Sequence, residues 1–191
     1  MPPLILASSS PYRRDLLARL GLEFEVLSGG VSETPLPGES PTDRALRLAQ
    51  AKARSVAALR PGALVIGADQ VAVVGEQLLD KPGSAEQCRV QLRALSGRSA
   101  RFHTGCALLE GSGRLLAHVD TTTVVFRPLQ ADEIERYVAR ERPYDCAGGF
   151  KAEALGISLF ECIESQDPTA LIGLPLIWLA AALRDAGLRV P

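Results

Sequence analysis

A short apolar strand that leads directly into a capped helix is the feature that most restricts the fold of this chain. Leu4, Ile5 and Leu6 form an apolar run of the length expected for a buried strand. Ser10 is a natural helix N-cap, and Pro11 suits the first helical position, where its missing N–H costs nothing. The chain therefore begins as a strand, a tight turn and a helix, and the other elements are organised around this stretch.

The turn between this strand and helix suits an anion. Ser8 lies in the turn with two further serines, and Arg13 and Arg14 follow in the first helical turn. A helix N-terminus favours negative charge, so two cations there gain nothing from the helix itself. Hydroxyl groups, backbone N–H groups and two guanidinium groups together suit a phosphate. The alternative is a capped helix with two solvated arginines.

Composition excludes several classes of protein. A formal net charge of −1 argues against a general nucleic-acid binder, so we expect no nucleic-acid polymer as partner. Four widely spaced cysteines without a C-x-x-C pair indicate neither a zinc site nor a redox motif. We expect them to be reduced and mostly buried thiols.

No segment is typical of a membrane or secreted protein. The longest apolar run, 170–183, is broken by Gly173 and Pro175 and is shorter than the roughly 20 residues that span a bilayer. The N-terminus lacks a basic region followed by a long apolar one, so no secretory signal is indicated. We therefore expect a cytoplasmic protein without a membrane partner. No linker, charge block or repeat divides the chain, which predicts one domain over residues 1–191.

Periodicity and turn signals predict the remaining elements. Helices are expected from Pro41 to about Leu59, from a cap at Ser84 to about 96, over 132–140 and within 171–183. Strands are expected at 24–27, 63–68, 101–109, 115–125 and 157–163, with a hairpin over 71–79.

Asp69 follows the clearest buried strand, 63–68. A carboxylate at the end of such a strand is expensive to desolvate unless it is paired or functional, and ligands collect at the carboxyl ends of strands in α/β sheets. We favour a functional Asp69 over one that caps a turn. Glu33, in the loop 31–39, is the second candidate carboxylate.

Two lysines are further candidates. Lys52 is one helical turn from both Leu48 and Val56, so it either snorkels to the rim or points into a cleft, and taken alone the position favours snorkelling. Lys81 follows the hairpin, where a plain surface turn is the simpler interpretation. Two carboxylates among such cations suit metal-assisted phosphoryl chemistry with Mg²⁺, although the spacing does not choose the bond that is cut.

The same residues resemble the Maf family of nucleoside triphosphate pyrophosphatases, and the matching segments follow one another in family order over nearly the whole chain. They are Ser8-Ser9-Ser10-Pro11-Tyr12-Arg13-Arg14, Glu33-Thr34-Pro35, Ala51-Lys52-Ala53, Gly67-Ala68-Asp69-Gln70-Val71, Asp80-Lys81-Pro82, Ala147-Gly148-Gly149-Phe150 and Ile172-Gly173-Leu174-Pro175. The resemblance implies a single elongated α/β domain with a mixed, bent sheet, flanking helices and a cleft between two lobes. It also implies cleavage between the α- and β-phosphates with a divalent metal, Mg²⁺ or Mn²⁺, and leaves a homodimer open.

Roles follow from the resemblance residue by residue. Asp69 looks like the proton acceptor that activates water. Glu33, with Asp69, is a candidate metal ligand. The residues that look like phosphate ligands are Ser8, Arg13, Lys52 and Lys81, and Arg14 matches the motif but has a structural ion pair as its alternative.

Three positions resemble the branch of the family that acts on 7-methyl-GTP. This chain has Tyr12, Gln70 and Glu153 where the dTTP/UTP branch has arginine, threonine and glutamine. An aromatic face attracts the cationic 7-methylguanine ring, and a carboxylate can accept from guanine N1–H and the N2 amino group. The 7-methyl-GTP branch usually has tryptophan at position 12, so Tyr12 is a mild departure.

The resemblance predicts a small nucleotide as substrate and removal of a modified nucleotide from the pool as function. The alternatives are a dTTP/UTP or broad-specificity pyrophosphatase, and a nucleotide-sensing regulator of septum formation.

Overall fold

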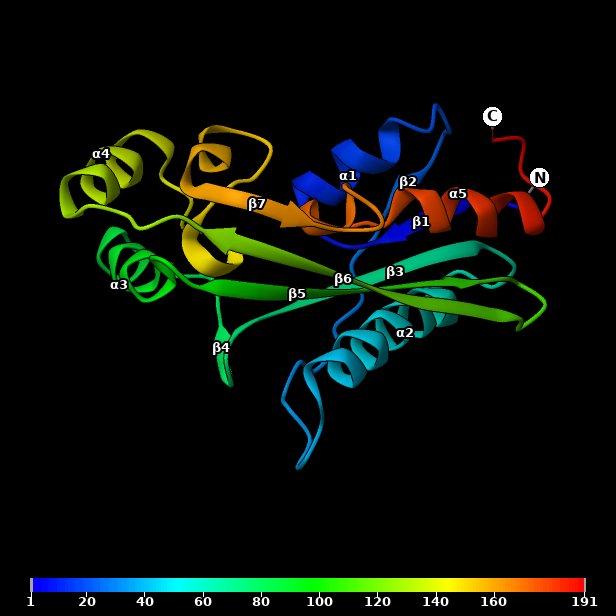
Figure 1. Ribbon diagram of the computed structural model, residues 1–191. Helices are drawn as coiled ribbons and strands as arrows, with labels where there is room; N and C mark the ends of the chain where they lie inside the picture. Colours follow the sequence, from blue (N-terminus) through cyan, green and yellow to red (C-terminus); the bar gives the residue numbers. More distant parts are fainter. Residues whose placement is uncertain (1, 191) are drawn as a thin grey trace. The chain divides into compact units, whose positions relative to one another are not determined.

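The computed structural model describes residues 2–190, which form both helices and strands (Figure 1). The α-helices are α1 (Pro11–Ala18), α2 (Pro41–Leu59), α3 (Ala85–Leu95), α4 (Ala131–Glu141) and α5 (Leu176–Asp185). The strands are β1 (Leu4–Ala7), β2 (Glu25–Val26), β3 (Leu64–Val74), β4 (Gln77–Leu79), β5 (Ser99–Leu109), β6 (Leu115–Phe126) and β7 (Phe160–Glu164). Short 3₁₀ turns lie at Ala147–Gly149, Leu155–Leu159 and Ala170–Ile172.

The strands form a mixed sheet. Its hydrogen-bonded order is β2-β1-β3-β5-β6-β7, with β4 paired to β3. β1 runs parallel to both β2 and β3, whereas β3–β4 and β6–β7 are antiparallel pairs. The predicted α/β fold with a mixed sheet and flanking helices is confirmed. The single domain, the bend and the cleft between lobes stay predictions.

Contacts along the chain group into two compact units. The first unit comprises Met1–Gln70, His103–Asp120 and Asp167–Pro191, and the second comprises Val71–Phe102 and Thr121–Gln166. Neither unit is a continuous piece of chain.

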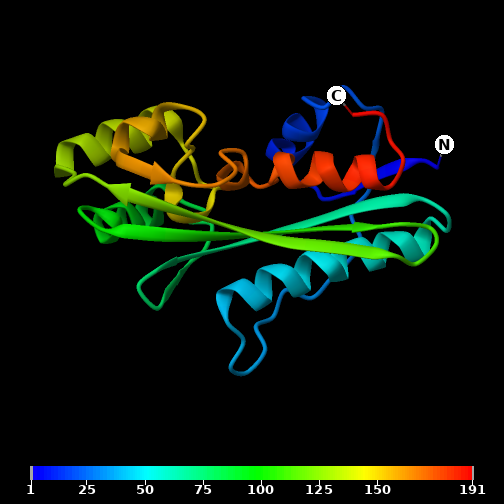
Figure 2. The same ribbon diagram turned by 45° about the vertical axis from the view of Figure 1, so that its right-hand side comes forward.

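The first unit buries a layer of apolar side chains on each face of its strands. Alternate residues of a strand point to opposite faces. Leu4 and Leu6 therefore pack with α1 and α5, while Ile5 and Ala7 pack with α2. Figures 1 and 2 show α1 and α5 on one side of these strands and α2 on the other.

The second unit has an aromatic core and a helix pair. Rings of Phe102, Phe126, Phe150 and Phe160 meet edge to face at centroid distances of 5.1–5.4 Å, a favoured aromatic geometry. Helices α3 and α4 lie side by side (Figure 1).

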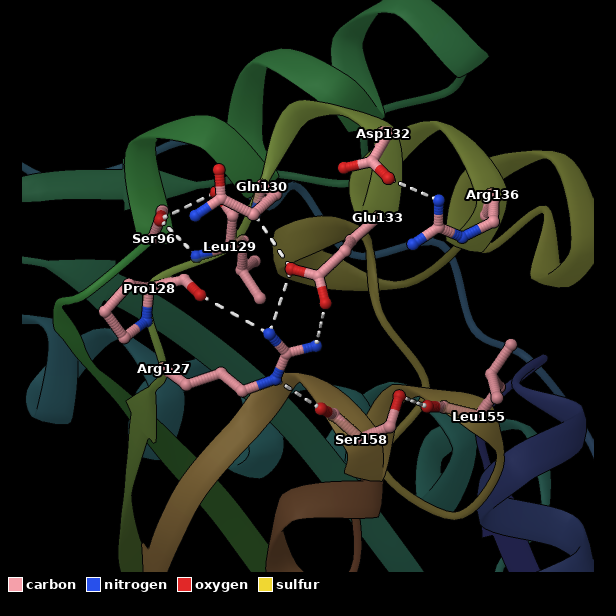
Figure 3. A network of polar contacts seen from close by, with 10 residues as sticks. All are labelled: Ser96, Arg127, Pro128, Leu129, Gln130, Asp132, Glu133, Arg136, Leu155 and Ser158. Atoms are coloured by element: carbon pink, nitrogen blue, oxygen red, sulfur yellow. Dashed lines mark hydrogen bonds and ion pairs between the residues drawn. The ribbon is translucent and has the colours of Figure 1, made fainter.

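A polar network fixes the start of α4 (Figure 3). Arg127 donates from both terminal nitrogens to Glu133 at 3.0 Å, and its Nε donates to the carbonyl of Ser158 at 2.8 Å. Glu133 also accepts from the backbone N–H of Gln130 at 2.8 Å, which satisfies a donor at the helix end.

Two predicted boundaries were wrong. The strand expected at 63–68 continues as β3 to Val74, so Asp69 lies inside a strand and not at its end. The parallel ladder with β1 does end at Gly67, but the antiparallel pairing of Ala72 with Leu79 in β4 keeps the chain extended. The strand expected at 157–163 begins only at Phe160, because short-range hydrogen bonds fold the preceding residues into a 3₁₀ turn.

In the part of the chain that the structure describes, none of the helices has the length and apolar character needed to cross a bilayer.

Candidate functional site

The N-terminus of α1 is built as the sequence predicts. Ser10 Oγ accepts from the backbone N–H of Arg13 at 3.4 Å and caps the helix. Ser8 is buried and lies just beyond β1, where its Oγ accepts from the N–H of Ser10 at 3.2 Å. Two hydroxyl groups and the first N–H groups of a helix therefore converge on one turn, an arrangement suited to binding an anion.

Arg13 turns inward from α1. Its Nε donates to the carbonyl of Gly173 at 3.0 Å and its Nη1 donates to Ser8 Oγ at 3.4 Å. Burial lowers the pKa of Arg13, while the charges of Asp69, Cys106 and Glu33 act in the opposite direction. The guanidinium group is thus held beside Ser8, and the solvated-arginine alternative is wrong for Arg13.

Gly173 has a role that the sequence interpretation missed. Its φ of +128° is rarely adopted by L side chains, and a Cβ there would lie 3.2 Å from Arg13 Nε. The glycine inside Ile172-Gly173-Leu174-Pro175 therefore allows its own carbonyl to receive the arginine.

Arg14 points elsewhere. Its guanidinium group pairs with the carboxylate of the adjacent Asp15 at 3.0 Å, and both side chains are more than half exposed. This is the structural ion pair that the sequence leaves open.

Lys52 of α2 joins the two candidate carboxylates. Its Nζ lies 2.6 Å from Asp69 Oδ1 and 2.6 Å from Glu33 Oε1. Asp69 is buried and Lys52 is mostly buried, whereas the Glu33 side chain is 58% exposed. The snorkelling favoured for Lys52 taken alone is wrong, because two carboxylates hold the ammonium group at the inner side of the helix.

A glycine lets α2 approach β3 closely enough for this contact. A Cβ at Gly67 would lie 2.1 Å from the carbonyl oxygen of Ala49 and 2.7 Å from the amide nitrogen of Ala53. Those residues flank Lys52 on α2, and Gly67 is two residues before Asp69 on β3. The close approach therefore brings the lysine and the aspartate together.

Two arginines of α2 hold the loop that carries Glu33. Arg44 Nη2 donates to the carbonyl of Glu33 at 3.0 Å, and Arg47 Nη2 donates to the carbonyl of Thr34 at 3.3 Å. Arg47 also forms an ion pair with Glu39, and its hydrogen bond lowers the pKa of that carboxyl to about 2. The sequence interpretation missed this pair, although two arginines three residues apart on a helix after an acidic loop were the available signal.

Gln70 is tied into the first unit. Its Nε2 donates to Thr104 Oγ1 at 2.9 Å and to the carbonyls of Ala170 and Leu171 at 3.2 and 3.0 Å. The amide nitrogen has two hydrogens, so these acceptors occupy it and leave Oε1 to contact a ligand. Tyr12, the other specificity candidate in this unit, lies half-buried on α1.

The second unit carries the other two predicted residues. Lys81 is exposed in the segment between β4 and α3, and among residues 2–190 it makes no ion pair. Glu153 is exposed in the turn at 152–154. Both side chains are accessible to solvent.

The cysteines differ in exposure. Cys88 and Cys106 are buried, and burial raises the pKa of these thiols to about 11 and about 12. Cys146 is half-buried and Cys162 is exposed, so the expectation of buried thiols holds for two of the four.

Glu33 and Asp69 offer carboxylate oxygens, the type of ligand that a divalent metal such as Mg²⁺ takes. Within residues 2–190 no group of three or more His, Cys, Asp or Glu side chains is arranged to hold an ion. Mg²⁺, however, is commonly bound through one or two carboxylates together with water and substrate phosphates. Glu33 and Asp69 already share one cation, Lys52, and so fit this mode.

Comparisons with known proteins show the family to which this chain belongs and agree with its fold. The family model described as "Maf-like protein" matches residues 3–186. A "7-methyl-GTP pyrophosphatase" of Xanthomonas oryzae pv. oryzae (strain MAFF 311018) is 56% identical over all of both chains. Proteins of the same name from Bordetella pertussis and Nitrosococcus oceani are 52% and 50% identical, covering 98% and 99% of this chain and 94% and 96% of theirs.

Among solved structures, the Staphylococcus aureus Ham1 protein superimposes with a TM-score of 0.54 at 15% identity. The match covers 96% of this chain and 99% of that one, and it shows a shared fold alone. The family model and the full-length relatives together establish that the chain belongs to the Maf family.

Proposed function

We propose that the protein is a 7-methyl-GTP pyrophosphatase that hydrolyses the bond between the α- and β-phosphates and releases 7-methyl-GMP and diphosphate. The observation that carries the proposal is full-length identity of 50–56% to relatives of that name. The first unit contains the residues to which we assign metal binding, proton transfer and phosphate binding: Glu33, Asp69, Lys52 and Arg13. Lys52 joins the two carboxylates there.

The residues of the first unit divide the work between phosphate binding and proton transfer. Ser8, Arg13 and the N–H groups that begin α1 bind phosphate oxygens, as does Lys52 once it leaves its carboxylates. Asp69 accepts the proton of the attacking water, a role that contributes typically about 10²–10⁴-fold in rate. By resemblance, Lys81 also binds phosphate. Arg14 would bind phosphate only after its ion pair with Asp15 has broken.

The metal is assigned to Glu33 and Asp69. When bound, Mg²⁺ or Mn²⁺ would neutralise part of the negative charge of the phosphates. Activity should therefore be lost with EDTA and return when either ion is added in excess. Full activity in EDTA would overturn the assignment.

Base recognition is assigned to Tyr12, Gln70 and Glu153. The tyrosine face attracts the cationic 7-methylguanine by about 0.5–2 kcal/mol. The Glu153 carboxylate accepts from N1–H and the N2 amino group, a pair of donors that thymine and uracil lack. Gln70 contacts the base through its Oε1, because its amide nitrogen already donates to Thr104 and to the carbonyls of Ala170 and Leu171.

The test is diphosphate release with Mg²⁺ from 7-methyl-GTP, GTP, dTTP, UTP and CTP. A strong preference for 7-methyl-GTP is expected. Glu153→Gln should reduce the rate with 7-methyl-GTP at least tenfold, whereas Glu161→Gln, an exposed glutamate of β7, should not. Preference for dTTP or UTP would keep the reaction and overturn the base assignment, and turnover of none of them would overturn the enzyme.

A further inference from the structure

We propose that in the nucleotide-free protein the Lys52 ammonium group occupies the place of the divalent metal between Glu33 and Asp69. The lysine then excludes the metal until nucleotide phosphates draw the ammonium group away. The proposal rests on the proposed function for the arrival of the phosphates, but the exclusion of the metal stands on the geometry and charges of these residues.

The geometry is that of a shared cation. Lys52 Nζ lies 2.6 Å from one oxygen of each carboxylate, so those two oxygens lie no further apart than twice this distance. A Mg²⁺ ion with bonds of about 2.0–2.1 Å needs neighbouring oxygen ligands roughly 3 Å apart and opposite ones roughly 4 Å apart. Glu33 and Asp69 can thus close on a metal with a small shift, provided that the ammonium group has left.

The charge balance explains why the metal would not simply join the lysine. Two carboxylates and one ammonium group leave a single negative charge, and Arg13 lies close enough for the charges of both carboxylates to act on it. A divalent cation that arrives alone therefore meets no net negative charge and a cation already in its place. A nucleoside triphosphate brings several negative charges and offers Lys52 new partners.

The lysine is the movable member of the cluster. Arg44 and Arg47 hold the backbone of the Glu33 loop through carbonyls, independently of Lys52. Asp69 is fixed by its position within β3. Lys52 has a flexible four-carbon stem, so it can leave while the backbone that carries each carboxylate stays in place.

The test measures Mn²⁺ binding to the nucleotide-free protein by electron paramagnetic resonance of the unbound ion. Lys52→Met should bind Mn²⁺ at least tenfold more tightly than wild type. Glu33→Gln added to Lys52→Met should abolish the gain, which assigns the new affinity to this pair of carboxylates.

Lys151→Met is the matched control. It removes the same charge from a pair with Glu141 at 3.7 Å and should leave Mn²⁺ affinity within about twofold of wild type. If Lys52→Met fails to fold, Lys52→Gln replaces it, because it removes the same positive charge and keeps a polar side chain at this position. An affinity no tighter than that of wild type or of Lys151→Met overturns the proposal. Nucleotide is absent from these measurements, so an error in the proposed substrate cannot change the Mn²⁺ affinity that they report.

Discussion

Among single residues, Asp69 and its partner Lys52 carry the most chemistry. Their contact joins a buried carboxylate to a mostly buried ammonium group at 2.6 Å, seventeen positions apart in sequence. Periodicity places Lys52 on the apolar side of α2, but the choice between rim and interior depends on a partner that the helix itself does not contain. The chemical character of both residues could be predicted from sequence, and their pairing could not.

Asp69→Asn tests the assigned base. The amide cannot take up the proton of water, so the rate with 7-methyl-GTP should fall at least about 100-fold. Nucleotide binding, followed by calorimetry, should persist. Asp185→Asn, at a surface ion pair with Arg114, is the control and should keep wild-type rates. Retention of a biological effect by Asp69→Asn without turnover would favour the nucleotide-sensing alternative.

The Glu39–Arg47 pair predicts a pH dependence of stability. Arg47 lowers the pKa of Glu39 from 4.5 to about 2. A lowered folded-state pKa gives stabilisation that is complete above the unfolded value and is lost as the pH falls from 4.5 through about 2. The difference in free energy of unfolding between wild type and Glu39→Gln, measured in urea, should shrink across that window. Arg47→Gln should show the same loss, and a difference that stays constant with pH would contradict the pairing.

At the scale of elements, the packing of α2 on the sheet decides the geometry of the site. Gly67 on β3 and Gly105 on β5 both face the helix backbone, where added Cβ atoms would meet carbonyl oxygens at 2.1 and 2.3 Å. Ser40 and Pro41 fix where α2 begins, which the sequence predicts. The helix lies close to the strands because these glycines have no Cβ. The sequence shows where the glycines are, but it does not show that the backbone of α2 packs against them.

Gly67→Ala should separate α2 from β3. The methyl group cannot fit 2.1 Å from a backbone oxygen, so overpacking should cost about 1–3 kcal/mol or more of stability. The shift should also weaken the Lys52–Asp69 contact and lower the rate with 7-methyl-GTP. Thermal unfolding and diphosphate release measure the two effects. Gly30→Ala is the control, since a Cβ there meets nothing within 4 Å, and equal behaviour of the two variants would refute the role of Gly67.

At the scale of the whole molecule, the chain passes between its two units four times, after residues 70, 102, 120 and 166. Neither unit can therefore be separated by a single cut of the chain. Such interleaving favours one cooperative folding unit, in keeping with the predicted single domain.

Equilibrium unfolding tests this expectation. The fluorescence of Trp178, which belongs to the first unit, and far-UV circular dichroism, which reports on both, should give coincident transitions in urea. Separate transitions would show that the units unfold independently. Trp178→Phe, followed by circular dichroism alone, controls for the probe.

The starts of three helices and the chemical types of the candidate site residues follow from the sequence alone. Helix caps at Ser10, Ser40 and Ser84 each accept a backbone N–H as the residue pattern predicts, because capping depends on neighbours within three or four positions. The serine-rich turn and the buried strand are likewise predicted from residues that are neighbours in sequence. The resemblance to the Maf family supplied roles for these residues.

Which of those residues meet depends on how the helices pack on the sheet. Contacts of the site join positions 17 to 160 residues apart. They are the ion pairs of Lys52 with Glu33 and Asp69, the hydrogen bond of Gln70 to Thr104, and the hydrogen bond of Arg13 to the carbonyl of Gly173. The extension of β3 past Asp69 likewise depends on its ladder partners and not on its own residues. Such contacts form because packing of helices on a sheet brings distant side chains within hydrogen-bond range, and no local pattern encodes that distance.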